Sequence, residues 1–205
     1  MLAAAVSAGG PAHGVIDEAL RSFNELESYS VTLRSLGADK DEREIIRYYY
    51  KKPGFVRMEF EKPHGGAVLV YDPRSKKARL RPFGFFRSFV LTLDPGSSLI
   101  KSSRGHTVDE SDIGALLENL KTLSEGGKTV VLREEEAGGR AASVVSVEGG
   151  EGAETDGVHR YVIWFDKKAH LPLKVISYDI DGNLVEEVLM DGMEVNPGLP
   201  VDFFR

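Results

Sequence analysis

The stretch LKVISYDIDGNLVEEVLM, residues 173–190, contains the clearest β-hairpin of the chain. Apolar and polar side chains alternate from Leu173 to Tyr178 and again from Leu184 to Met190, which is the two-residue period of a β-strand. Between these segments, Asp181-Gly182-Asn183 places glycine and asparagine where a tight turn requires a positive φ. We therefore expect two antiparallel strands with a fixed register.

The same alternation recurs along most of the chain. It predicts further strands at residues 29–34, 46–51, 55–61, 67–71, 77–81, 89–93, 129–132, 142–147 and 159–165. Residues 15–26 and 111–123 instead show helical spacing; for the second helix we expect Asp109 or Ser111 as N-cap, acidic residues in the first turn and Gly126-Gly127 at the end. The order of helix, strands, helix and strands predicts an α+β domain with two principal helices and one long antiparallel sheet of about ten strands.

Composition narrows the class of protein. With 205 residues, 41% of them hydrophobic, the chain can bury a sizeable core, and we expect a single domain over residues 13–205 and a monomer. Its 26 Lys and Arg against 32 Asp and Glu give a charge of −6, which argues against a nucleic-acid partner. The absence of cysteine excludes disulfides, thiolate metal sites, a Cys nucleophile and an acylated N-terminal Cys.

The N-terminal residues suggest export. The sequence has no apolar run of 18 residues, so no transmembrane segment is expected. Residues 1–12 begin with small and apolar side chains, and Val6-Ser7-Ala8 has the small-residue pattern of a signal cleavage site, although a charged n-region is missing. A truncated signal, a late start codon and a flexible tail all fit; we expect a periplasmic protein.

Residue types that carry chemistry are scattered. The five histidines show no His-x-x-x-His spacing, and no Gly-x-Ser-x-Gly, Walker or dinucleotide glycine pattern occurs. Adjacent carboxylates such as Glu186-Glu187 point to opposite faces of a strand and are interpreted as solvated charge. We expect no metal, no cofactor, no catalytic residues and no enzymatic activity.

Residues 74–89 stand out against this background. Phe83, Phe85, Phe86 and Phe89 lie within seven residues and require burial, either in the core or around a hydrophobic cavity. The same region is locally basic, which fits an acidic protein partner, an anionic membrane or a solvated strand face. The candidate docking residues for an envelope protein are Arg74, Lys76, Lys77, Arg79 and Arg81.

Several short motifs occur along the two halves of the predicted sheet. They are PGFVRMEF at 53–60, EKP at 61–63, VYDP at 70–73, the segment 77–82, WFDKK at 164–168, LPLK at 171–174, the segment 178–182 and VNP at 195–197. Together these motifs resemble the LolA/LolB-like lipoprotein-carrier superfamily. The resemblance implies a curved, incompletely closed antiparallel sheet with helices over its concave face and a hydrophobic pocket for acyl chains. It also implies that Arg57 holds a helical lid closed. Met58 departs from the family, which usually has an aromatic residue there.

The resemblance implies that the ligand of such a pocket is a lipid acyl chain or a lipoprotein. Each methylene removed from water contributes roughly 0.8 kcal/mol, so an acyl chain can be held there without a specific polar contact. Large apolar side chains on alternating or helical faces are the lining candidates: Val56, Met58, Phe60, Val68, Val70, Phe83, Phe86, Phe89, Leu116, Leu120, Trp164 and Ile176. We therefore predict a carrier in outer-membrane lipoprotein sorting or envelope lipid transport. The alternatives are an envelope-stress regulatory module on the same fold and an enzyme with convergent polar groups in the cavity.

Overall fold

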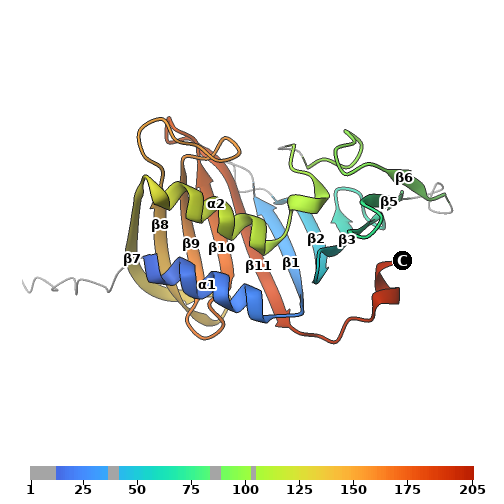
Figure 1. The fold of residues 1–205 in the computed structure, drawn as a ribbon, viewed down its shortest axis with the longest axis horizontal. Coiled ribbons are helices and arrows are strands. Elements are labelled where there is room, and N and C mark those ends of the chain that lie inside the picture. The colour runs from blue at the N-terminus through green and yellow to red at the C-terminus, as the bar shows by residue number, and fades with distance from the viewer. Residues whose placement is uncertain (1–12, 37–41, 84–88, 103–104) are drawn as a thin grey trace, which may run out of the picture.

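A computed structural model describes residues 13–36, 42–83, 89–102 and 105–205. Within these residues, eleven strands form one sheet in which every neighbouring pair is antiparallel, in the order β6-β5-β4-β3-β2-β1-β11-β10-β9-β8-β7 (Figure 1). The expected signal remnant at residues 1–12 lies outside the described part. Because β1 pairs with β11, the strands before and after α2 form one continuous sheet.

The strands follow the alternating segments, with some boundaries moved. Their bounds are β1 Ser28–Leu36, β2 Glu42–Lys51, β3 Phe55–Lys62, β4 Val68–Asp72, β5 Lys77–Arg81, β6 Leu91–Leu93, β7 Lys128–Ala137, β8 Arg140–Glu148, β9 Arg160–Asp166, β10 Pro172–Tyr178 and β11 Leu184–Val195. In the quoted hairpin, Gly182 has a φ of 82° and the Asn183 amide donates to the Asp179 carboxylate over 2.7 Å. β7 continues through three glutamates because it is an edge strand, where charged side chains remain in water.

Two helices, α1 His13–Glu25 and α2 Ile113–Glu125, cover one face of the sheet (Figure 1). The N-cap of α2 is Asp112, whose carboxylate accepts hydrogen bonds from the amides of Gly114 and Ala115. The expectation of Asp109 or Ser111 was wrong, and the first turn of α2 carries no acidic side chain. Asp109 belongs instead to the 3₁₀ helix η2 Val108–Glu110. No described helix has the length and hydropathy needed to cross a membrane.

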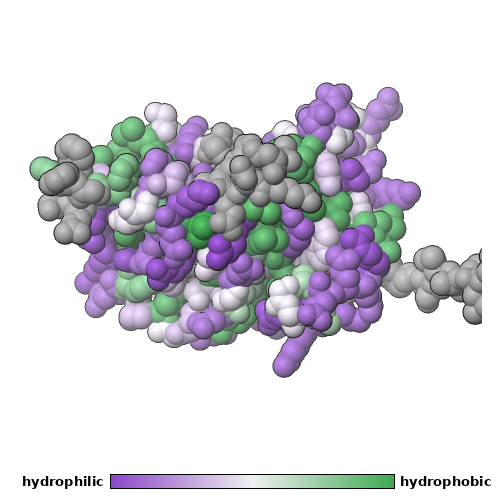
Figure 2. Space-filling model, turned by 180° about the vertical axis from the view of Figure 1, so that it is seen from behind, coloured by the Kyte–Doolittle hydropathy of each residue, from purple (hydrophilic) through white to green (hydrophobic). Residues whose placement is uncertain are grey.

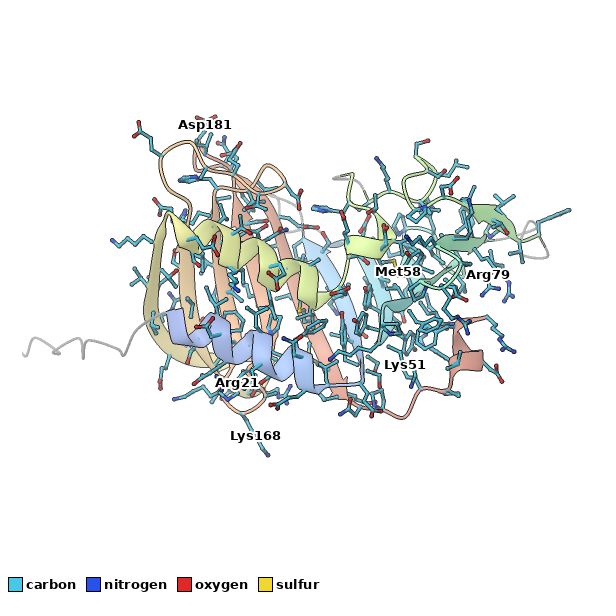
Figure 3. All side chains as sticks on the ribbon, viewed as in Figure 1. Arg21, Lys51, Met58, Arg79, Lys168 and Asp181 are labelled. Atoms are coloured by element: carbon cyan, nitrogen blue, oxygen red, sulfur yellow. The ribbon has the colours of Figure 1, made fainter. Side chains whose placement is uncertain are left out.

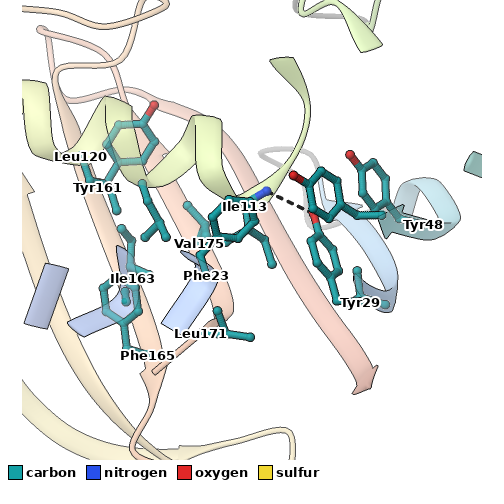
Figure 4. Packing of buried hydrophobic residues seen from close by; sticks show 14 of the residues in the cluster. Phe23, Tyr29, Tyr48, Ile113, Leu120, Tyr161, Ile163, Phe165, Leu171 and Val175 are labelled. Atoms are coloured by element: carbon teal, nitrogen blue, oxygen red, sulfur yellow. Dashed lines mark hydrogen bonds between the residues drawn. The ribbon is translucent and has the colours of Figure 1, made fainter. Parts of the chain in front are cut away.

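The main core lies between these helices and the concave face of the sheet. Figure 4 shows Phe23 of α1 and Leu120 of α2 in one cluster with Ile163, Phe165 and Val175 of β9 and β10. The convex face carries two smaller buried clusters. One surrounds Trp164 on β9, and the other packs below the C-terminal 3₁₀ helix η3 Val201–Phe204. The single curved antiparallel sheet with helices over its concave face, predicted from the sequence, is thus confirmed.

Candidate functional site

The concave face is hollowed into a cavity of about 710 Å³. Its floor is a row of directly paired apolar side chains, which share one face because cross-strand partners in an antiparallel sheet point the same way. From β1 to β5 the row consists of Val31, Tyr48, Met58, Leu69 and Leu80. The start of α2 and the segment that precedes it close the other side.

Four of the predicted lining residues contact the cavity. They are Met58 and Phe60 on β3, Phe83 after β5 and Leu116 on α2. Val56 and Leu120 are buried in the main core, outside the cavity wall. Phe89 is exposed and does not line the cavity, and Phe86 lies outside the described residues.

The other four predicted lining residues belong to the convex face. Val68 and Val70 pack with η3, and Trp164 and Ile176 form the cluster on β9 and β10. Their assignment to the cavity was therefore wrong. The segments Val68–Tyr71 and Tyr161–Phe165 are apolar at successive positions because both faces of the sheet are covered there. In such a run, periodicity does not distinguish the two faces.

Arg57 does not hold a helical lid. Its guanidinium lies on the convex face, where it donates to Glu59 over 2.8 Å and to the carbonyl oxygen of Phe203 over 3.0 Å. It also lies 4.7 Å from the centroid of the Phe203 ring. Arg57 therefore anchors the C-terminal segment to β3, on the side of the sheet opposite the helices.

Two tyrosines connect the cavity floor to the start of α2. The Tyr29 hydroxyl accepts a hydrogen bond from the Ile113 amide over 3.1 Å (Figure 4), and the Tyr48 hydroxyl lies 3.0 Å from Ser111 Oγ. Burial raises the pKa of both phenols, so both remain protonated. These contacts fix the edge of the cavity. The sequence analysis placed Tyr29 and Tyr48 on strands but did not identify this role.

The cavity has a polar end formed by Glu44, Glu186 and Ser177, beside His64. Ser35 donates to the Glu186 carboxylate over 2.8 Å. Burial, followed by the nearby Glu186 charge, raises the pKa of Glu44, while His64 acts in the opposite direction. The half-buried Glu186 lines the hollow, and the adjacent Glu187 points to the other face of β11, where it pairs with Lys174 over 2.5 Å. Among the described residues, no three His, Asp or Glu side chains are arranged to hold a metal ion.

This geometry agrees with the comparisons to known proteins. A family model described as a protein of unknown function, DUF1571, matches residues 24–205. The chain belongs to the DUF1571 family. A search of curated proteins found no match to the sequence of this DUF1571 chain.

Solved structures show the same fold. An uncharacterized conserved protein from Thermus thermophilus has 12% identity and a TM-score of 0.57, over 95% of the DUF1571 chain and 93% of its own. The Mycobacterium tuberculosis lipoprotein LppX has 10% identity and a TM-score of 0.56, over 93% of the DUF1571 chain and 98% of its own. A chain of the MucA/MucB complex of Pseudomonas aeruginosa has 15% identity and a TM-score of 0.51, over 95% of the DUF1571 chain and 60% of its own. The DUF1571 chain has a LolA-like fold, as its motifs predicted.

Proposed function

We propose that this DUF1571 protein is a non-enzymatic periplasmic carrier that binds an acyl chain of a lipid or lipoprotein in the cavity. The observation that carries the proposal is the cavity itself, whose volume of about 710 Å³ falls within the range of small-molecule sites. Its floor is apolar across five adjacent strands. Transfer of methylenes from water, at roughly 0.8 kcal/mol each, holds such a ligand without a chemical step.

The first test combines native mass spectrometry of protein purified from a bacterial envelope with titration of a fluorescent fatty-acid probe. Leu116→Asp places a charge in the cavity wall, and we expect it to weaken probe binding by about tenfold or more because a buried carboxylate must be desolvated. Leu132→Asp is the matched control, since Leu132 is exposed on β7 and lies outside the cavity. Both variants are first checked for folding by circular dichroism.

Copurified lipid, or saturable probe binding that Leu116→Asp alone weakens, supports the carrier. Protein that is purified from the envelope without bound lipid and does not bind the probe contradicts the carrier proposal.

The second candidate function is a regulatory module that binds an envelope protein. The observation that favours it is the similarity to the MucA/MucB complex, in which a protein of this fold class is found with a partner. The docking surface is then the basic set on and before β5: Arg74, Lys76, Lys77, Arg79 and Arg81. A pull-down from envelope extract, repeated with these charges reversed, tests it. This candidate is favoured over the carrier if the pull-down captures one specific protein, the charge-reversed variant does not capture it, and the cavity holds no lipid.

A further inference from the structure

Exposed apolar side chains gather at one end of the sheet. In the part of the chain that the structure describes, nine large hydrophobic side chains are exposed, and five of them lie between residues 83 and 99. We call these five the apolar rim; they are Phe83, Phe89, Val90, Leu91 and Leu99. Figure 2 shows apolar residues at the end of the molecule that carries β5 and β6, on the left in this view. Such clustering marks an interaction surface, whereas single exposed residues do not.

The apolar rim is continuous with the cavity. Phe83 and Leu99 line the cavity and are also exposed, so they form part of its mouth. Leu91 on β6 pairs directly with Leu80 on β5, which belongs to the cavity floor. Because paired residues share a face, the apolar floor extends from the cavity to the outer edge of the sheet. An acyl chain entering here stays in contact with apolar surface.

The same end of the molecule is positively charged, although the whole chain carries −6. Described residues between 72 and 102 include six cations against two carboxylates, Asp72 and Asp94, and Arg74 pairs with Asp72 over 2.7 Å. Lys77 pairs with Asp94 over 2.5 Å. Lys76, Arg81 and Lys101 form no ion pair within the described chain; Lys76 and Arg81 are exposed, and Lys101 is exposed beside the cavity. The excess of cations next to the apolar rim is therefore available to an anionic partner.

We propose that this end of the molecule docks on the surface of an anionic lipid bilayer, with the cavity mouth facing the lipid. The apolar rim enters the interface while the cations contact the head groups, as amphipathic membrane-surface segments do. This inference extends the proposed carrier function, because it provides a route for the acyl chain that avoids water. A lipid surface fits better than an acidic protein, since two of the exposed apolar residues, Phe83 and Leu99, line the cavity and Leu91 continues its apolar floor.

The test is cosedimentation with vesicles of phosphatidylcholine alone and of phosphatidylcholine containing about one third phosphatidylglycerol, at low and high salt. Two double variants address the two components: F89S with L91S, and K76E with R81E. None of these four residues lines the cavity. The matched controls are Ile180→Ser, an exposed apolar residue elsewhere, and Lys168→Glu, which lies far from Arg79 (Figure 3).

We expect wild-type protein to bind the anionic vesicles, binding to weaken with salt, and each double variant to lose about tenfold in partitioning, with both controls unchanged. Equal binding to both vesicle types, no vesicle binding, or equal losses in the controls would overturn the proposal. Capture of an acidic envelope protein through Lys76 and Arg81, without vesicle binding, would also overturn it.

The two proposals fail in distinguishable ways. The docking variants keep normal titration of the fluorescent fatty-acid probe in vesicle-free solution if the carrier proposal holds. Leu116→Asp keeps vesicle binding and loses the probe. If vesicles are not bound but the probe is, the membrane surface is wrong and the carrier remains; if vesicles are bound but the probe is not, the carrier function is wrong.

Discussion

At the scale of single residues, the most informative side chain is a carboxyl group at the polar end of the cavity. Glu44 lies at the polar end of the cavity, where burial and the Glu186 charge raise its pKa above the ordinary value of 4.5. The folded protein therefore holds this proton more tightly than the unfolded chain does. Ionisation of Glu44 consequently opposes folding at pH values above both pKa values.

Glu44→Gln removes this opposition. We expect the urea midpoint of the variant to exceed that of the wild type at pH 7, because the amide carries no charge to desolvate. The difference declines as the pH falls through the raised pKa and disappears near pH 3, where Glu44 is neutral in both states. Urea titrations across this pH range measure the effect, with Glu118→Gln on the exposed side of α2 as the control. A variant that is less stable than the wild type at pH 7 would contradict the argument.

At the scale of secondary-structure elements, the two helices pack closely through Gly114. A Cβ added at Gly114 would stand 2.5 Å from Cε1 of Phe23 on α1 and 2.8 Å from Oδ1 of Asp112, the N-cap of α2. Both distances are below van der Waals contact. The glycine therefore sets the spacing of α1 and α2, and with it the position of the helix that closes the cavity.

Gly114→Ala should lower the melting temperature. The overpacking cost of about 1–3 kcal/mol exceeds the gain in helix propensity, which is at most about 1 kcal/mol and smaller in a first turn. Gly126→Ala is the matched control, because that C-cap glycine has a φ of −122° and no atom within 4 Å of an added Cβ. Thermal unfolding of both variants distinguishes the effects; a Gly114→Ala protein as stable as the control would show that the helices separate at little cost.

At the scale of the whole molecule, the C-terminal segment connects the middle of the sheet, where β11 pairs with β1, to the strands β3 and β4. After β11, the chain crosses to the convex face of β3 and β4, where Phe204 is only 1% exposed and its ring lies 5.7 Å from that of Phe55. Arg79 donates to the Phe204 carbonyl over 2.9 Å. This segment covers apolar surface that the two helices on the other face do not reach.

Phe204→Ala tests that role. Removing a buried phenylalanine leaves a cavity, and we expect a loss of about 3–5 kcal/mol in the free energy of unfolding, measured by urea denaturation. Val201→Ala in the same 3₁₀ helix is the control, since Val201 is exposed and should change stability by less than about 1 kcal/mol. Similar losses in both variants would mean that the segment acts as a whole and that Phe204 is not its anchor.

Sequence alone determined the local structure. Alternation identified the strands, helical spacing identified α1 and α2, and the glycine of the quoted hairpin identified the turn, because these features depend on residues a few positions apart. The curved sheet was implied by short motifs between residues 53 and 197 that resemble those of LolA/LolB-like carriers. The N-cap of α2 was misplaced by one residue from Ser111, since adjacent polar residues all favour a cap.

The tertiary structure alone decided which face each strand turns to the cavity. Val70 and Trp164 lie in runs that are buried on both faces, so their positions depend on whether a helix or η3 covers them. The contact between Tyr29 and Ile113 joins residues 84 positions apart, and the cavity floor draws on five strands. The periodicity of apolar residues in a sequence indicates that one face of a strand is buried. The element that covers this face is decided by long-range packing, which a local pattern does not contain.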